Sequence, residues 1–436
     1  MSSSSRRIDR LQATFDHDGI VANAGLIVPA TLMARLGLEA LIDTWVRTGS
    51  SRPGRKILTL VAAMLAGATH IDHVNILRAG ATQRVLPFTV MAPSTIGSFL
   101  GSFTFGHIRQ LDAVLSRTLA RAWEAGAGPG AGPLVVDLDS TICEVHGKHK
   151  QAAGYGYTKQ LGYHPLLATR AGTGEVLFAR IRKGSANTAR GVVRFVDELV
   201  ANLARAGAIG QMTVRADSGF WSWKLCDRLD THRIGWSITV RLVPKVKAVI
   251  AGIDEDAWAD IDYTIRGQAQ VAETTYVAGK GTKKRTVRLI VRRTRLVEPA
   301  QRRLWPDWRH HAFITNTELD TIAADRFHRE HATVELAIRD LKEGAGLNHI
   351  PSGHYHANAA WLACATLAHN LGTWTGLLAR QPAVTNRTRR TRLIQIPAVI
   401  ANRSGRTLLR FPTRWPWAQA STKTLNALRA LPAPSG

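Results

Sequence analysis

The sequence predicts an α/β protein whose core is a mixed β-sheet. After a run of Gly, Ala and Pro at 126–133, short apolar strands come first in succession and then alternate with helices, in the order β-β-β-α-β-α-β. The chain has 436 residues, which allows two or three domains, and 45% hydrophobic residues, which allow a large buried core. This composition excludes a mainly disordered or collagen-like chain.

Residues 1–130 are predicted to form a helical N-terminal region. Apolar residues recur at helical spacing over 28–42, 57–66 and 107–125. The Gly- and Pro-rich run that follows has the composition of a linker and separates this region from the next.

Residues 131–242 are predicted to form the first part of the core. The expected strands are 134–139, 163–169, 176–181, 212–216 and 234–242, and the expected helices are 187–206 and 221–229. Residues 243–315 then show a purely strand-like alternation with a basic hairpin tip, and we expect them to form a β-rich insertion.

Residues 316–380 are predicted to form the second part of the core. A helix over 320–343 ends at two glycines, and an uncharged apolar segment follows at 359–379. We interpret this segment as a buried core helix rather than a membrane span, because it contains several polar residues and follows an amphipathic helix. The remaining residues, 381–436, form a basic C-terminal tail without an acidic residue.

The charge of the chain indicates a polyanionic partner. There are 57 Lys and Arg residues against 32 Asp and Glu residues, which gives a net charge of +25, and 44 of the basic residues are Arg. The planar Arg side chain binds phosphate through two parallel hydrogen bonds, so nucleic acid is the expected partner. Three cysteines and a start without an apolar segment favour a reducing compartment and no signal peptide.

Acidic residues follow two of the predicted strands. Asp137 and Asp139 lie two residues apart at the end of the first strand and share one face of it. Asp217 follows the fourth strand directly, before a Gly turn. Because ligands bind at the carboxyl ends of strands in open α/β sheets, we expect Asp139 and Asp217 to come together. Asp137 either supports that site from behind or stands in a capped turn.

A third acid lies on the helix predicted over 320–343. If this helix is continuous, with 100° per residue, Glu335 lies at the edge of its apolar stripe. Basic or ionisable side chains share that edge, namely His328, His331, Arg339 and Lys342. The same geometry places Asp325, Asp340 and Glu343 on the solvated side.

Two aspartates at strand ends and a glutamate on a later helix suit a site for two metal ions. Carboxylate oxygens are the ligands of Mg²⁺ or Mn²⁺, and such ions stabilise the attacking and leaving oxygens of a phosphoryl displacement. The residues therefore predict metal-dependent phosphoryl transfer on nucleic acid.

These motifs resemble those of DDE transposases with a ribonuclease H-like core, and most closely the 1380 family of bacterial insertion sequences. The resemblance rests on Asp137-Leu-Asp139-Ser-Thr141, on Arg215-Ala-Asp217-Ser-Gly-Phe220 and on the spacing of Glu335 and Lys342, and it spans about residues 20–420. It implies that Asp139, Asp217 and Glu335 are the catalytic, metal-binding acids. It also implies a β-rich insertion between the second and third acids.

The sequence departs from the family pattern on the late helix. Related transposases carry Tyr, then Arg three residues later, then Glu and Lys, whereas this chain has His328 at the Tyr position and His331 at the Arg position. Neutral imidazole binds phosphate more weakly than Arg does. Both histidines remain candidates for DNA binding, with Arg339 one turn after Glu335 as a substitute and Lys342 as the expected Lys.

Further DNA contacts are expected from basic segments, and the resemblance implies how they are used. The N-terminal region would bind the terminal inverted repeats, and the protein would act on element ends and target DNA as a dimer or higher multimer in the bacterial cytoplasm. The candidate phosphate-binding residues outside the late helix are Lys148, Lys150, Lys159, Arg387, Arg389, Arg390 and Arg392.

Two other functions stay open at this point. A ribonuclease H-like nuclease or junction resolvase would use the same acids, but the long N-terminal region and the insertion argue against it. A catalytically inactive, DNA-binding derivative of a transposase is kept open by the two histidines, although all three acids are present.

Overall fold

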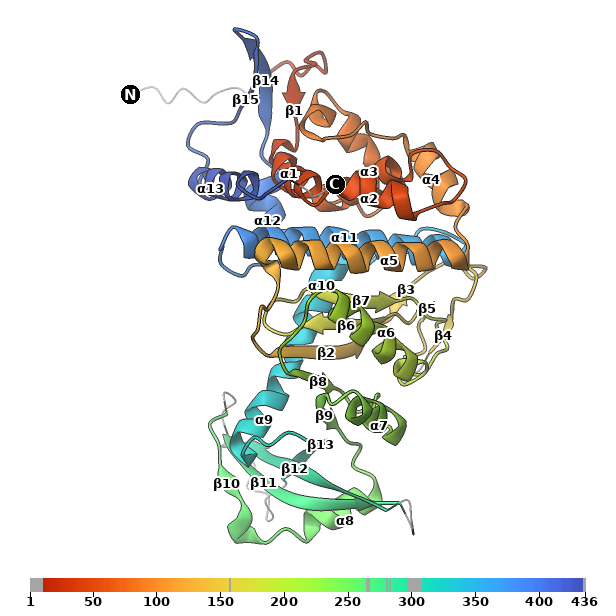
Figure 1. Ribbon diagram of the computed structural model, residues 1–436, viewed down its shortest axis with the longest axis vertical. Helices are drawn as coiled ribbons and strands as arrows, with labels where there is room; N and C mark the ends of the chain where they lie inside the picture. The colour runs from red at the N-terminus through yellow and green to blue at the C-terminus, as the bar shows by residue number, and fades with distance from the viewer. Residues whose placement is uncertain are drawn as a thin grey trace.

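The computed structural model describes residues 11–156, 158–263, 267–279, 281, 284–296 and 308–433. Two long helices, α5 (Phe105–Ala122) and α11 (Tyr355–Leu378), lie side by side across the middle of the molecule (Figure 1). Shorter helices cover one side of this pair, and the main sheet lies on the other side. The predicted mixed α/β architecture is therefore confirmed.

The layer built from the N-terminal residues is helical, as predicted. It contains α1 (Ile27–Arg35), α2 (Leu38–Trp45), α3 (Pro53–Ala66), α4 (Pro93–Gly101) and the 3-10 turns η2 (Ala24–Leu26), η3 (Ile71–Arg78) and η4 (Thr82–Val85). The apolar pattern over 28–42 gives two helices instead of one, because Gly37 stands between them at φ 61°, where glycine has no steric penalty. A π turn, η5 (Trp123–Ala127), ends α5 and leads to the sheet.

In the described part of the chain, the main sheet has nine strands in the order β10-β11-β12-β13-β9-β8-β2-β6-β7. In chain order they are β2 (Leu134–Ser140), β6 (Leu166–Arg170), β7 (Val176–Arg180), β8 (Met212–Ala216), β9 (Gly235–Thr239), β10 (Ala259–Asp260), β11 (Gly267–Ala278), β12 (Arg285–Leu296) and β13 (Arg309–Thr315). β2, β6 and β7 are antiparallel neighbours, whereas β8 lies parallel to β2 and β9 parallel to β8. The helix α6 (Val192–Arg205) connects β7 to β8, and the helix α7 (Trp223–Thr231) connects β8 to β9, as the sequence order predicts.

The strand predicted over 163–169 is divided between two sheets. Its first residues belong to β5 (Leu161–Tyr163), which pairs with β3 (Cys143–Glu144) and β4 (Gly154–Tyr155) in a small three-stranded sheet. The chain crosses from β5 into β6 at His164 and Pro165.

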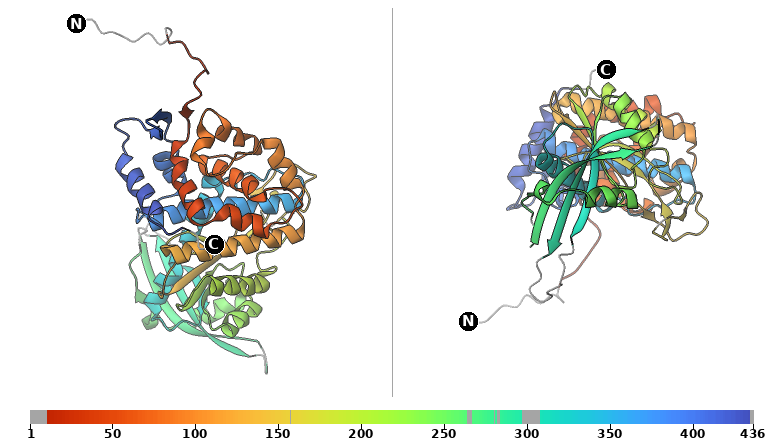
Figure 2. Two further views of the ribbon diagram at one scale, coloured as in Figure 1. Left: turned by 45° about the horizontal axis from the view of Figure 1, so that its top comes forward. Right: turned by 90° about the horizontal axis from the view of Figure 1, so that it is seen from below.

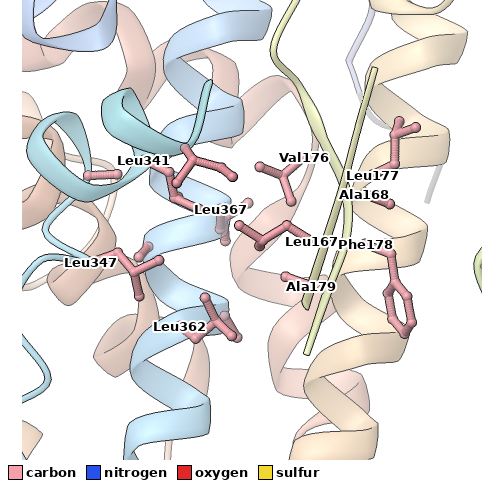
Figure 3. Packing of buried hydrophobic residues seen from close by; sticks show 14 of the residues in the cluster. Leu167, Ala168, Val176, Leu177, Phe178, Ala179, Leu341, Leu347, Leu362 and Leu367 are labelled. Atoms are coloured by element: carbon pink, nitrogen blue, oxygen red, sulfur yellow. The ribbon is translucent and has the colours of Figure 1, made fainter. Parts of the chain in front are cut away.

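The helix α11 is the buried core helix expected over 359–379. Nineteen of its 24 residues are buried, between the N-terminal helices and the sheet. Figure 3 shows Leu367 of α11 and Leu341 of α10 (Val334–Gly344) facing Leu167 and Val176 on the sheet. Among the described residues, no single helix has both the length and the apolar character to cross a membrane. Two bent helix pairs are long and apolar enough only when both helices of the pair are taken together: Ala24–Arg35 with Leu38–Trp45, and Pro53–Ala66 with Ile71–Arg78.

The segment 243–315 extends the core sheet. Its long hairpin of β11 and β12 is joined through β13 to β9, so that the core strands and the inserted strands form one continuous sheet (Figure 2). The expectation of a purely strand-like segment was wrong at its start, where α8 (Pro244–Ala251) and a 3-10 turn, η6 (Glu255–Ala257), precede the strands. Pro244 fits there because the first turn of a helix does not need its backbone N–H.

The late helix is interrupted, which changes where its acidic side chains lie. α9 (Thr321–Arg329) and α10 are separated by a 3-10 turn, η8 (Glu330–Thr333). Asp325, expected in solvent, is fully buried and pairs with Arg292 of β12 at 2.7 Å and with Arg329 at 2.9 Å. Asp340, also expected in solvent, is largely covered by the chain after α11. Both expectations assumed one straight, solvent-facing helix.

Residues 380–433 are folded against the N-terminal layer. They form α12 (Asn386–Arg389), a π turn η9 (Arg390–Ile394), β14 (Ala398–Arg403), β15 (Arg406–Arg410) and α13 (Ala418–Arg429). β14 pairs with β1 (Ile20–Val21), and α13 packs on α1 (Figure 1). The expected basic tail is therefore a structural part of the N-terminal layer.

Candidate active site

The parallel pairing of β2 and β8 brings two of the predicted acids to one edge of the sheet. Leu138 lies opposite Ala216 in this ladder, so Asp139 and Asp217 follow side by side at the carboxyl ends of the two strands. Asp217 is exposed, and its Oδ1 accepts a hydrogen bond from the Gly219 backbone N–H at 3.0 Å. This turn holds the Asp217 carboxylate at the strand end.

The third acid, Glu335, lies in the first turn of α10 and is exposed. An acidic side chain is favoured there, because the N-terminal end of a helix carries a partial positive charge. The turn η8 ends at Thr333, two residues before Glu335.

The pKa of Asp139 is affected by the charges of both other acids. The pKa of Asp139 is raised to about 6, mainly by burial; the negative charges of Asp217 and Glu335 contribute to this rise, whereas the Ser140 N–H and the charge of His331 oppose it. Asp139 is thus close enough to both other acids to be affected by their charges. Within the described residues, no three His, Cys, Asp or Glu side chains are yet arranged as a ready-made metal site.

A buried ion pair lies directly behind this edge. Asp137 and Arg215 are opposite one another in the β2–β8 ladder, and both side chains are only 1% exposed. Arg215 donates Nε–H to Asp137 Oδ1 at 2.7 Å and Nη2–H to Oδ2 at 3.0 Å. Its third nitrogen, Nη1, donates to the Phe327 carbonyl at 2.6 Å, which ties α9 to the sheet.

His331 connects the buried pair to the acids. Its Nδ1 lies 3.0 Å from Asp137 Oδ1, and its charge lowers the pKa of Asp139. Because the carboxylate of Asp137 can only accept, Nδ1 carries the proton in this contact, and Nε2 is the ring nitrogen left for other partners. Asp137 therefore accepts a hydrogen bond from His331 and holds its ring in place. Sequence reasoning did not identify Arg215 as the counter-ion of Asp137. The signal was present, because Asp137-Leu-Asp139 and Arg215-Ala-Asp217 have matching spacing on paired strands.

His328 has a different place from the one predicted. It is buried, with Nδ1 2.7 Å from Ser237 Oγ and Nε2 2.9 Å from Thr239 Oγ1, and its ring stacks on Phe313. Burial, and then the neighbouring positive charges, hold its pKa well below the usual value, so the ring is neutral. His328 cannot reach DNA in this position, because both ring nitrogens are occupied by internal hydroxyl groups.

Two of the predicted phosphate-binding arginines are also used inside the protein. Arg389 is buried and donates to Asn386 Oδ1 at 3.2 Å. Arg390 donates to backbone carbonyls of the N-terminal layer and of α10, including Leu65 O at 3.0 Å and Gly344 O. Arg390 thus attaches the C-terminal segment to the rest of the chain, whereas Arg389 is buried within that segment, and DNA contacts at these two positions stay a prediction.

The other predicted DNA-binding residues differ in exposure. Lys342 donates to Ile142 O at 2.7 Å, and Lys150 donates to Ile350 O, so these two amines are held by backbone carbonyls. Solvent reaches the remaining ones, which are Lys148, Lys159, Arg339, Arg387 and Arg392.

A cavity of about 760 Å³ lies beside the buried pair, between α10, α11 and the turn that joins β6 to β7. Asp137, Arg215 and Glu330 line it, but Asp139, Asp217 and Glu335 do not. The three acids therefore lie outside this cavity.

One of the comparisons with known proteins identifies a family for this chain. A search of curated proteins gave no match. Among solved structures, the cryo-EM structure of the piggyBac transposase synaptic complex with hairpin DNA is similar at 12% sequence identity and a TM-score of 0.47, over 86% of this chain and 79% of that chain. The family described as transposase DDE domain group 1 matches residues 4–433, nearly the whole chain. The chain therefore belongs to this family of DDE transposases.

Proposed function

We propose that this transposase cuts DNA at the ends of a mobile element and joins those ends to target DNA. Asp139, Asp217 and Glu335 are the catalytic acids of both steps. The observation that supports this assignment is the environment of Asp139, a largely buried carboxylate whose pKa is raised to about 6 first by burial and then by the charges of the other two acids. Three acids that repel one another in this way favour binding of a divalent cation.

The donor set fits Mg²⁺ or Mn²⁺, since all three side chains offer carboxylate oxygens. When bound, such ions activate water and stabilise the oxygens of phosphoryl transfer. The residues of the chain would hold these ions in place. Asp139 and Asp217 stand at neighbouring strand ends, and Glu335 approaches from α10. His331, supported by Asp137, lies beside them and offers Nε2 to the DNA strand.

We also propose the finer assignments that the sequence suggests. The strands β2, β6, β7, β8 and β9 form a ribonuclease H-like core, supported by their mixed order of three antiparallel strands and two further parallel ones. The proposed divisions are 1–130, 131–242, 243–315, 316–380 and 381–436. The protein works as a multimer on terminal inverted repeats in the bacterial cytoplasm, as a member of the 1380 family of insertion sequences.

The test is a strand cleavage and joining assay on a DNA substrate that carries the element's own terminal repeat, with Mg²⁺ present. Asp139→Asn, Asp217→Asn and Glu335→Gln should each lose activity by more than about 100-fold, because even outer partners of a metal site contribute about 10- to 100-fold. Glu343→Gln, an exposed change on the same helix, is the matched control. Unchanged activity in any of the three acid variants contradicts the assignment, and cleavage without joining would instead indicate a nuclease.

A further inference from the structure

A second cavity, of about 330 Å³, lies where β7 ends and α6 begins. Among the residues that the structure describes, no acidic one lines it, whereas five basic side chains do: Arg180, Arg182, Lys183, Arg190 and Arg194. None of them was singled out by the sequence motifs. Positive charge is therefore concentrated in this cavity.

Two of the five charges are already compensated. Arg180 donates to Glu198 Oε2 at 2.7 Å and to Asp112 Oδ2 at 3.0 Å, and Arg194 donates to Glu198 Oε1 at 3.0 Å. Both arginines line the cavity, whereas their acidic partners lie outside it. This leaves the other three basic residues, which have no acidic partner within the described part of the chain.

Arg182 is the most informative of these three residues, because it is only 9% exposed. It donates Nε–H to His164 O at 2.9 Å and Nη1–H to three carbonyls of the loop before α6, the closest being Thr188 O at 2.8 Å. Its Nη2 is buried without a hydrogen-bond partner among the described residues. Burial lowers the pKa of Arg182 to about 10, which reflects the cost of a cation without a counter-ion.

The backbone adds further positive potential at the same place. Gly191 precedes α6 in a left-handed conformation, φ 78°, and the first turn of this 14-residue helix lines the cavity. Free N–H groups and the helix dipole make such a helix start favourable for anions. Lys183 and Arg190 are exposed at the cavity mouth, where their side chains can close over a bound group.

The cavity is joined to the catalytic edge by short contacts. His164, whose carbonyl Arg182 binds, has Nε2 2.9 Å from Ser140 Oγ, next to Asp139. The loop before α6 also touches the other strand end, since a Cβ on Gly219 would lie 2.8 Å from Thr188 Cγ2. A polymer that passes over the three acids is therefore within reach of this basic cavity.

We propose that this cavity is a phosphate-binding subsite, in which Arg182, Lys183, Arg190 and the start of α6 hold one phosphate group. In the proposed function it receives a backbone phosphate of the DNA strand that leads to or from the reacting one, and to that extent it rests on that function. Phe105 lines the same cavity and is 63% exposed, which provides a face for the adjoining nucleotide.

The test uses the full-length protein with the double substitution Lys183→Gln and Arg190→Gln, at two exposed positions. The control carries Lys224→Gln and Lys247→Gln, which remove the same charge from exposed positions outside the cavity. Titration calorimetry measures inorganic phosphate binding, and a duplex oligonucleotide gives the dependence of affinity on salt.

The cavity variant should weaken phosphate binding by about tenfold or more relative to the control, because charge-assisted hydrogen bonds are lost. If DNA supplies the phosphate, the slope of log K against log salt should also fall by about 0.9, the value of one phosphate contact. Loss of phosphate binding with an unchanged slope supports the cavity but identifies a free phosphate ion as its occupant. Equal behaviour of both variants in both titrations overturns the proposal. Because neither titration needs catalysis, failure of the cleavage assay would not affect this result.

Discussion

The buried pair of Asp137 and Arg215 gives the sharpest prediction for stability. Replacing Asp137 by Asn keeps the size of the side chain but leaves the Arg215 cation buried, at 1% exposure, with the Phe327 carbonyl and a longer contact to Glu330 at 3.3 Å. Breaking a buried pair by removing one partner costs about 3–5 kcal/mol. We expect the free energy of unfolding of Asp137→Asn to fall by this amount.

Urea unfolding at pH 7 measures this loss, and Glu330→Gln is the control. Glu330 also contacts Arg215, but its side chain is 63% exposed, so its removal should cost less than about 1 kcal/mol. With a urea dependence of about 1–3 kcal/mol per M, the Asp137→Asn midpoint should fall by about 1 M or more. If both variants unfold within about 0.5 M of the parent, the pair does not carry the stability that its burial implies.

Three further predictions concern other parts of the chain. Because the pKa of Asp139 is raised to about 6, the folded state loses stability as the pH rises from about 4, where the unfolded chain ionises, to about 6, and the loss is complete above that pH. Asp139→Asn should therefore stabilise the metal-free protein by roughly 3 kcal/mol at pH 8, with the difference gone below about pH 4 in thermal or urea unfolding. Gly25→Ala should unfold at much lower urea than the parent, because its Cβ would lie 1.7 Å from Leu393 O, whereas Gly97→Ala has open space and should be neutral or slightly stabilising. The exposed arginines of β14 and β15 are Arg403, Arg406 and Arg410. Replacing them by Gln should reduce the slope of log K against log salt for DNA binding by about 0.9 per lost phosphate contact, without lowering the unfolding midpoint. An unchanged slope would exclude this hairpin from the DNA-binding surface.

Local patterns predict the strands that position the candidate site. The apolar residues of β2 and β8 indicate both strands, and the rule that ligands bind at the carboxyl ends of strands is enough to place Asp139 beside Asp217. The environment of Asp139 cannot be predicted in the same way. It depends on the distance between charges that are far apart in the sequence, and on how deeply β2 is covered.

The incorrect predictions have a common physical origin, because side chains that were expected in solvent are buried by segments far away in the sequence. A helical period cannot show that η8 interrupts the late helix, nor that β12 covers Asp325 and supplies Arg292 as its counter-ion. The cluster of arginines likewise suggested Arg389 as a DNA-binding residue, and its pattern cannot show that this side chain is buried and donates to Asn386 Oδ1.

The pairing of β1 with β14 has a consequence for how the protein is made. Ile20 lies opposite Val399, so one strand of this small sheet is synthesised long before its partner exists. Contacts between residues so far apart form late and slow folding, and until then apolar surface on the early segment stays uncovered. During translation the N-terminal helices would remain partly uncovered until the C-terminal hairpin and α13 have been synthesised. A chain whose synthesis stops early would expose an incomplete layer to chaperones and proteases. Completion of synthesis, and not the emergence of each successive region, would then decide when this molecule becomes a stable protein.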